Sequence, residues 1–235
     1  MRLLKFISVF TGGLLLLGIY AFGEVDKKET RGVAPFKEVG ISVAADVYIS
    51  QGKETTLILE GDPYTLEHIQ TSVLQGKLKI KYSTWKWNNY HKVKIYITSP
   101  DWHGIYVSGS AKVMNETPVE SDRLILNLSG SGDIQLDRLI INKTEARVSG
   151  SGDIHISGNQ KSQSLSVAIS GSGKVIAQGM EALDVDVSIS GSGSATIFAD
   201  NNLKAMIAGS GSVYYKGTGV VDARVSGSGK VRKIK

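Results

Sequence analysis

The sequence contains no cysteine, which excludes disulfide bonds, thiol catalysis and a lipid attached to an N-terminal cysteine. Proline is also scarce, with four residues among 235, whereas glycine is abundant, with 27. The formal net charge is only +5 at pH 7, too weak a bias to indicate a nucleic-acid partner. A chain rich in glycine is either disordered or built from many tight turns, and the alternating apolar pattern described below favours the second.

Residues 1–23 have the pattern of a secretory signal peptide. Arg2 and Lys5 form a short positive region, and an uncharged stretch follows. Ala21 and Gly23 are small residues at the −3 and −1 positions of a cleavage site that would end this segment. An uncleaved membrane anchor is the alternative, although the stretch is slightly shorter than the about 20 residues that a spanning helix needs. We expect export to the periplasm or the cell surface, with no transmembrane segment once the signal is removed.

A Gly-Ser-Gly triplet occurs six times in the second half of the chain, at intervals of 18 to 21 residues. Its glycines are Gly130, Gly132, Gly150, Gly152, Gly171, Gly173, Gly191, Gly193, Gly209, Gly211, Gly227 and Gly229. A degenerate copy, Gly109-Ser110-Ala111, precedes them. Apolar residues alternate with polar ones around each triplet, as at Leu124, Leu126 and Leu128, which indicates strands with one buried face. Each repeat is therefore predicted to be a strand, a glycine corner, a second strand and an outer loop.

Two architectures can use such repeats. Antiparallel hairpins would make a meander or a sandwich, whereas parallel stacking would make a solenoid with coils about 4.8 Å apart. The near-constant spacing and the identical corners favour the solenoid, because equivalent residues then form columns along the stack. Glycine permits positive φ and close backbone approach at a sharp corner, and a column of serines can hydrogen-bond along the stack. The outer loops are expected at Gly158-Asn159, Gly179, Asp200-Asn201-Asn202, and Gly217 with Gly219.

The N-terminal half repeats less clearly but contains similar elements. Residues 41–50 align with residues 148–157, which predicts an early coil whose corner is Val43-Ala44-Ala45. Asp62-Pro63 predicts the start of one short helix, with Leu66, Ile69 and Val73 on one helical face. Further strands are expected at 56–60, 78–82 and 93–98, the last two joined by a turn at Asn88-Asn89. The first coils also need a cover, since an open solenoid end exposes unpaired edge groups.

Several of these segments together resemble a known family. They are Phe36-x-x-Val39-x-Ile41-x-Val43, Asp46-Val-Tyr-Ile49, Leu57-Ile-Leu-Glu-Gly-Asp62, Gly76-Lys-Leu-Lys-Ile80 and the serial Ser-Gly-Ser-Gly-Asp/Lys turns. This combination is similar to the head GIN domain family of auto-transporter adhesins, and it covers residues 33–235. The resemblance implies an all-β, right-handed parallel β-helix in a cell-envelope protein, and it implies no catalytic residues. Many members are lipoproteins, and the absence of cysteine departs from that pattern.

The expected organisation is a signal peptide at 1–23, a short segment at 24–32 and one β-solenoid domain at 33–235, with coils of about 20 residues, the glycine-corner repeats at 108–230 and one short helix. Ligand contact is predicted at Trp85, Trp87, Tyr90 and Trp102, because exposed aromatic rings stack on sugars and other ligands. The alternative for these aromatics is packing of a hairpin across the side of the solenoid, with Trp102 in its cover.

Three alternative chemistries are weak here. A serine nucleophile needs a positioned base, and identical corner serines favour a structural column. Asp133 and Asp153 could bind calcium or act as a glycosidase carboxylate pair. Lys112 and Lys174 flank them in the predicted column, and this pattern favours an exposed face with neighbouring charges partly neutralised.

We therefore expect a non-catalytic envelope protein, an adhesin-like ligand-contact or scaffold module without cofactor or metal. Its partner would be a cell-surface glycan or another envelope protein, with no nucleic acid. Self-association through coil ends, and a carbohydrate-binding or polysaccharide-degrading β-helix, stay open as alternatives.

Overall fold

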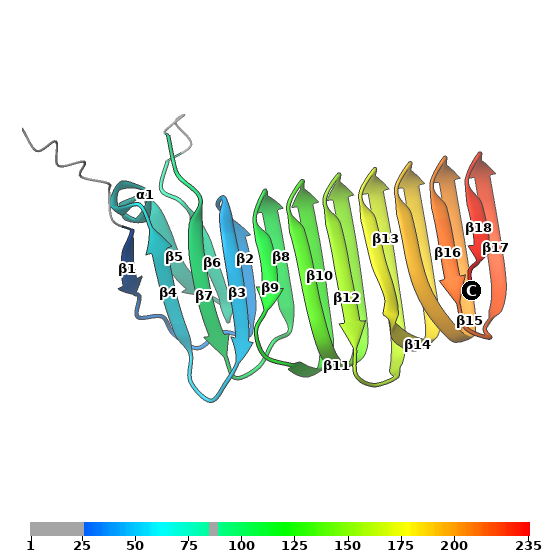
Figure 1. The fold of residues 1–235 in the computed structure, drawn as a ribbon, viewed down its shortest axis with the longest axis horizontal. Coiled ribbons are helices and arrows are strands. Elements are labelled where there is room, and N and C mark those ends of the chain that lie inside the picture. Colours follow the sequence, from blue (N-terminus) through cyan, green and yellow to red (C-terminus); the bar gives the residue numbers. More distant parts are fainter. Residues whose placement is uncertain (1–25, 85–88) are drawn as a thin grey trace, which may run out of the picture.

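The computed structural model describes residues 26–84 and 89–235, so the predicted signal peptide lies outside the described residues. Strands make up 72% of the chain and helix 2%, and the strands wind into a β-solenoid of about 6 turns (Figure 1). The predicted solenoid with one short helix is thus confirmed. Within the described residues, no helix is long and apolar enough to cross a membrane.

Strands that precede the corners form one parallel ladder, called here the pre-corner ladder. In stacking order it contains β6 (Lys77–Tyr82), β2 (Glu38–Ser42), β8 (Gly104–Gly109), β10 (Val119–Gly130), the second part of β11 (Asp133–Gly150), β13 (Ser162–Gly171), the second parts of β14 (Lys174–Gly191) and β15 (Ser194–Gly209), and β17 (Val220–Gly227). The register sets Gly130 opposite Gly150 and Gly150 opposite Gly171, so the glycine corners form a column.

Strands that follow the corners form the post-corner ladder. Its order is β7 (Val93–Ser99), β3 (Ala45–Gln51), β9 (Lys112–Asn115), the first part of β11, β12 (Asp153–Gly158), the first parts of β14 and β15, β16 (Ser212–Lys216) and β18 (Lys230–Lys233). The coil of β2 and β3, which turns at the predicted corner, comes first in the sequence. It nevertheless lies second in the stack, between the β6–β7 and β8–β9 coils.

The corners bring successive coils into close backbone contact. At the second triplet, the backbone N–H groups of Ser151 and Gly152 donate to the carbonyl of Gly130, at 3.0 and 3.1 Å. Gly150 has φ +124°, and a Cβ placed there would lie 2.5 Å from the same carbonyl oxygen. A Cβ on Gly152 would clash with the carbonyl of Gly132. The corner serines are exposed, and within the described residues no hydrogen bond joins their side chains. The expected column of hydrogen-bonded serine side chains is therefore not seen, and backbone groups make the bonds between successive corners instead.

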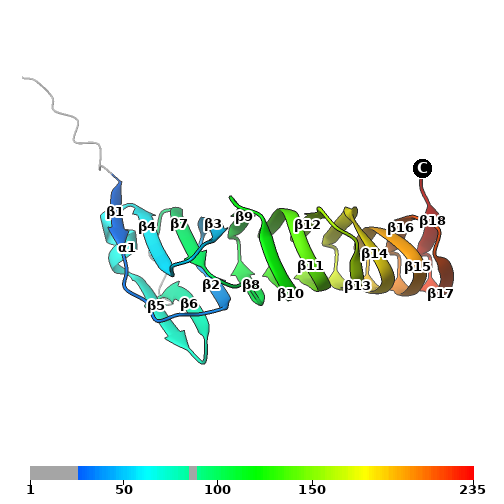
Figure 2. The same ribbon diagram turned by 90° about the horizontal axis from the view of Figure 1, so that it is seen from below.

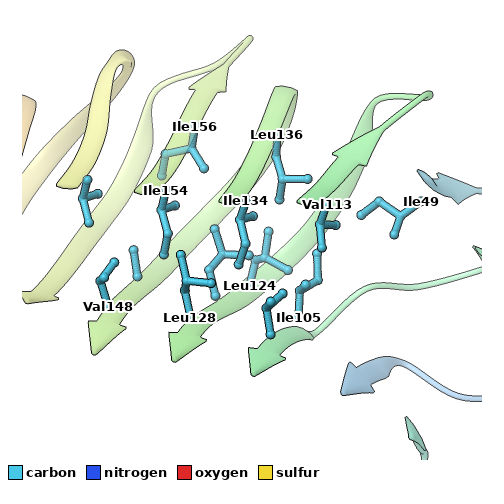
Figure 3. Packing of buried hydrophobic residues seen from close by; sticks show 14 of the residues in the cluster. Ile49, Ile105, Val113, Leu124, Leu128, Ile134, Leu136, Val148, Ile154 and Ile156 are labelled. Carbon is cyan, nitrogen blue, oxygen red and sulfur yellow. The ribbon is translucent and has the colours of Figure 1, made fainter. Parts of the chain in front are cut away.

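Inward side chains stack in columns that fill the interior (Figure 3). Val113, Ile134 and Ile154 are neighbours by register and are all fully buried. Leu128 and Val148 form a second such pair before the corner. Burial of each aliphatic side chain contributes about 1.5–3 kcal/mol relative to its exposure, so the repeat forms one continuous core.

The outer side of the coils turns less sharply than predicted. The expected loops are present at Gly158-Asn159, between β12 and β13, and at Gly217 to Gly219, between β16 and β17. The loops predicted at Gly179 and at residues 200–202 are wrong, because β14 and β15 continue through them. The pairing of these two strands changes register there, which lets the chain bend without leaving the ladder.

Antiparallel strands cover the first end of the stack (Figure 1). β4 (Thr56–Gly61) pairs with β7, and β1 (Lys27–Thr30) pairs with β4. β5 (Ile69–Leu74) pairs with β6, and this hairpin projects from the side of the stack (Figure 2). The short helix α1 (Pro63–Glu67) joins β4 to β5. The predicted cover is therefore present, and we call these elements the cap.

The helical face predicted for Leu66, Ile69 and Val73 is wrong beyond Leu66. The helix ends at Glu67, and both Ile69 and Val73 lie in β5. The cause is the two-residue turn at Gln75 and Gly76, which have φ of 51° and 72°. Two successive residues with positive φ make the type of turn that closes a tight antiparallel hairpin, and this holds residues 69–74 as an extended strand.

The opposite end of the stack has no such cover within the described residues. Val225 is 43% exposed, whereas its partner by register, Ile207, is buried. The outermost strand carries Lys230, Arg232 and Lys233, and positive charge on an edge strand disfavours edge-to-edge pairing. Self-association through this end of the stack therefore stays a prediction, and the positive charge of β18 disfavours it.

Alanine substitutions at three corner glycines should separate backbone strain from coil-to-coil clash. Gly109→Ala meets strain alone, since φ is +111° and no atom lies within 4 Å of its Cβ. Gly152→Ala introduces only a clash with the neighbouring coil, and Gly150→Ala introduces both the clash and the backbone strain. We expect urea unfolding to show a loss of about 1–3 kcal/mol for Gly109→Ala and the largest loss for Gly150→Ala. Equal losses at Gly109 and Gly150 would contradict a role for close backbone approach.

Candidate functional site

The tryptophans predicted for ligand contact do not form an exposed surface in the described part of the chain. Trp102 is fully buried, its Nε1–H donates to the carbonyl of Ser50 at 3.1 Å, and its ring meets Phe36 edge to face at 6.1 Å. The prediction of ligand contact at Trp102 is therefore wrong, and the packing alternative holds for it. Trp85 and Trp87 lie outside the described residues.

Tyr90 does belong to a group of aromatic rings at the capped end. Its ring stacks on Tyr82 at 4.3 Å between centroids, with 13° between the planes. Tyr64 and His68 lie beside it at 6.2 and 5.6 Å, and these two rings are 4.4 Å apart. We call Tyr64, His68, Tyr82 and Tyr90 the aromatic cluster. Tyr64 is 47% exposed, so it gives the cluster an accessible ring.

The cap brings these rings together from distant parts of the sequence. Tyr64 lies in α1 and His68 directly follows it, one helical turn apart. Tyr82 ends β6, and Tyr90 lies shortly before β7. Sequence reasoning missed Tyr64 and His68, although their spacing of four residues just after a helix start is a signal that two rings share one helical face.

A buried hydrogen-bond network fixes the helix under the cluster. Asp62 is the N-cap, as predicted, and its carboxylate accepts bonds from the backbone N–H and the hydroxyl of Thr65, both at 2.7 Å. The Thr65 hydroxyl in turn accepts a bond from the backbone N–H of His91 at 3.0 Å. The bonds from Thr65 hold the pKa of Asp62 below its ordinary value. This network joins α1 to the segment that carries Tyr90.

Tyr82 anchors the cluster to the solenoid. Its hydroxyl accepts a hydrogen bond from the backbone N–H of Ala44 at 3.2 Å, at the corner between β2 and β3. Burial raises the pKa of the Tyr82 hydroxyl, so this side chain stays neutral at physiological pH. The cluster is thus supported from below by a fixed ring, with Tyr64 on the outside.

The aspartates of the repeat are aligned as predicted, with Asp133 between Lys112 and Asp153, and Asp153 next to Lys174. Asp153 accepts a hydrogen bond from the backbone N–H of Lys174 at 2.9 Å. Its carboxylate therefore serves the stacking of adjacent coils, and in the described residues no group of three or more acidic or histidine side chains could hold a metal ion.

These features define the class of protein: a parallel β-solenoid whose repeated coils end in a cap that carries an accessible aromatic cluster. The chain belongs to the family described as "putative auto-transporter adhesin, head GIN domain", whose model matches residues 35–219. Membership confirms the resemblance seen in the sequence motifs.

Solved structures share this fold. A protein described as a "putative adhesin" from Bacteroides fragilis is 26% identical, with a TM-score of 0.85 over 90% of this chain and 98% of that one. A "putative lipid binding protein" from Parabacteroides distasonis is 23% identical, with a TM-score of 0.75 over 90% and 97%. A "putative adhesin" from Parabacteroides merdae is 22% identical, with a TM-score of 0.71 over 90% and 97%. No curated protein matches the chain.

Thr65→Val should loosen the cluster while keeping the shape of the side chain. The substitution leaves the His91 N–H without its acceptor, so we expect a loss of about 1–3 kcal/mol in the free energy of unfolding. We also expect a weaker near-ultraviolet circular dichroism signal from the stacked tyrosines. Thr65→Ser, which keeps the hydroxyl, should retain that signal. A wild-type spectrum in Thr65→Val would show that the network does not position the rings.

Proposed function

We propose that this protein is an exported, adhesin-type contact module that binds carbohydrate through the aromatic cluster of its cap and performs no catalysis. The observation that carries the proposal is the half-exposed ring of Tyr64, backed by His68 and by the stacked pair of Tyr82 and Tyr90. A flat ring held rigidly from behind offers a stacking surface to the apolar face of a sugar at little entropic cost.

The envelope location has two supports. The N-terminal residues carry the charge and size pattern of a signal peptide. The family is described as "putative auto-transporter adhesin, head GIN domain", a description that fits an exported protein. Both point to a protein that meets its ligand in the periplasm or at the cell surface.

Binding is favoured over hydrolysis by the composition of the grooves on the pre-corner ladder. One groove is lined by lysines, serines and Asn127, and another by serines, Met206 and Arg224, with no aspartate or glutamate in either lining. Glycoside hydrolysis ordinarily uses two carboxyl groups about 5–10 Å apart across the scissile bond. These grooves can hold a chain but lack those groups.

A glycan array tests the proposed contact. We expect the purified protein to bind a subset of glycans, and Tyr64→Ala to weaken that binding about tenfold through loss of the stacking surface. Tyr214→Ala, which removes a half-buried tyrosine from β16 in the last coils, is the matched control and should bind as wild type. Undiminished binding in Tyr64→Ala would refute the role of the cluster.

Cell fractionation tests the location. We expect the protein in the periplasmic or surface fraction, shortened by removal of residues 1–23, because the segment ends in small residues suited to cleavage. Mass spectrometry of the purified protein's N-terminus would identify the cut. Recovery of the full-length chain in the cytoplasm would contradict the proposal.

A further inference from the structure

A shallow groove of about 320 Å³ crosses the outer face of the pre-corner ladder in the capped half of the molecule. It extends over β6, β2, β8 and β10, so it runs across the strands and along the stack. Its polar lining comes mainly from Lys77, Lys79, Lys81, Ser42, Ser108 and Ser129. None of these residues belongs to the aromatic cluster.

The hollow arises where glycine replaces an outward side chain. Gly40 lies between Lys79 and Tyr106 by register. Because Gly40 has no side chain, the floor of the groove there is backbone, and the neighbouring strands form its walls. The Tyr106 ring folds down over Gly104, where a Cβ would lie only 2.7 Å from the ring. Two glycines in adjacent strands thus make room that larger residues would fill.

The charge in the groove is positive and partly unmatched. The Nζ atom of Lys77 lies 3.9 Å from a carboxylate oxygen of Glu38 and 3.1 Å from the centroid of the Tyr106 ring. Lys79 and Lys81 are exposed and form no ion pair with any residue that the structure describes. Burial lowers the pKa of Lys77; the carboxylate of Glu38 opposes this effect, and the neighbouring charge of Lys79 adds to it. Three like charges on one strand face repel each other, so a bound anion would relieve that repulsion.

Beyond the lysines of β6, serine hydroxyl groups line the groove along the stack. Ser42 neighbours Lys81 by register, and Ser108 neighbours Ser129. Successive strands of the ladder are about 4.8 Å apart, so the groove offers lysine donors followed by a row of hydroxyls. This sequence of groups suits a long ligand that carries both acidic groups and hydroxyls.

Two other classes of partner fit the groove poorly. Single-stranded nucleic acid needs open aromatic faces for base stacking, but Lys77 covers one face of the Tyr106 ring. A peptide added as a strand needs an unpaired edge, yet β6 pairs with both β2 and β5, and β2 pairs with both β6 and β8.

We propose that this groove binds an acidic glycan chain lying across the strands, with its anionic groups on Lys79 and Lys81 and its hydroxyls on the serine row. This site is separate from the aromatic cluster and does not depend on it. The shared requirement is a negatively charged substituent on a sugar chain, whether carboxylate, sulfate or phosphate.

Isothermal titration with dextran sulfate and with unmodified dextran of the same length tests the proposal. We expect the wild type to bind dextran sulfate and not dextran. The Lys79→Gln/Lys81→Gln variant should raise the Kd for dextran sulfate at least about tenfold, because it removes two charge-assisted contacts. Lys143→Gln/Lys204→Gln is the matched control, since it removes the same charge from exposed lysines of β11 and β15 that lie outside the groove. Its Kd should change less than about twofold.

A second variant fills the hollow and keeps every charge. Gly40→Thr adds a side chain at an extended position without positive φ, and its Cβ would lie 3.3 Å from the flexible Cε of Lys77. We expect weaker dextran sulfate binding with an unchanged unfolding midpoint. Ser188→Thr, at an exposed position in the same column of the ladder near the other end of the stack, should have no effect.

Three results would overturn the proposal. The first is an equal loss in the two lysine double variants, which would indicate general charge attraction. The second is binding to vesicles with anionic lipids but not to dextran sulfate or polygalacturonate, which would indicate a membrane surface. The third is full binding in Gly40→Thr. Tyr64→Ala should leave dextran sulfate binding intact, so failure here is distinguishable from failure of the aromatic contact.

Discussion

The close approach of backbone at the glycine corners is the constraint on which the solenoid depends. Each first glycine adopts a φ that other residues rarely adopt, and each carbonyl there accepts bonds from the next coil. A Cβ at either glycine would meet backbone that cannot move without separating the coils. Because the corners are locked in register, the inward and outward residues of the strands beside them fall into columns, and a slip by one residue would turn the core face outward.

With this register, the corners of the repeated coils present a uniform surface, whereas the irregular coils of the capped half present a distinctive one that is better suited to recognition. The repeated corners present exposed serines that differ little from coil to coil. In the capped half, the sequence departs from the repeat, and each departure changes the surface. Gly40 opens a hollow, β6 carries lysines at alternating positions, and the hairpin of β5 and β6 brings Tyr82 to the loop that carries Tyr90.

The repeat predicted the solenoid from sequence because glycine spacing and alternation are local signals. The capped half was predictable only in part. Asp62 correctly predicted the start of the helix. The turn at Gln75 and Gly76 was not predicted, and residues of β5 were therefore assigned to the helix. Burial of Trp102 depends on Phe36 and Ser50, which meet it only through the fold. The groove was equally hidden, since β2 enters the stack between β6 and β8 and so places Gly40 between strands distant in sequence.

The insertion of β2 and β3 between later coils also has a mechanical consequence. This coil pairs with β6 and β7 on one side and with β8 and β9 on the other. Strands β4 and β5 of the cap pair with β7 and β6, so the capped coil cannot separate from the stack without breaking parallel pairing on two ladders. The aromatic cluster is tied to the same coil through Tyr82 and Ala44. Both candidate surfaces are therefore anchored to the same coil, the groove through the pairing of β2 with β6 and β8 and the aromatic cluster through the hydrogen bond from Ala44 to Tyr82.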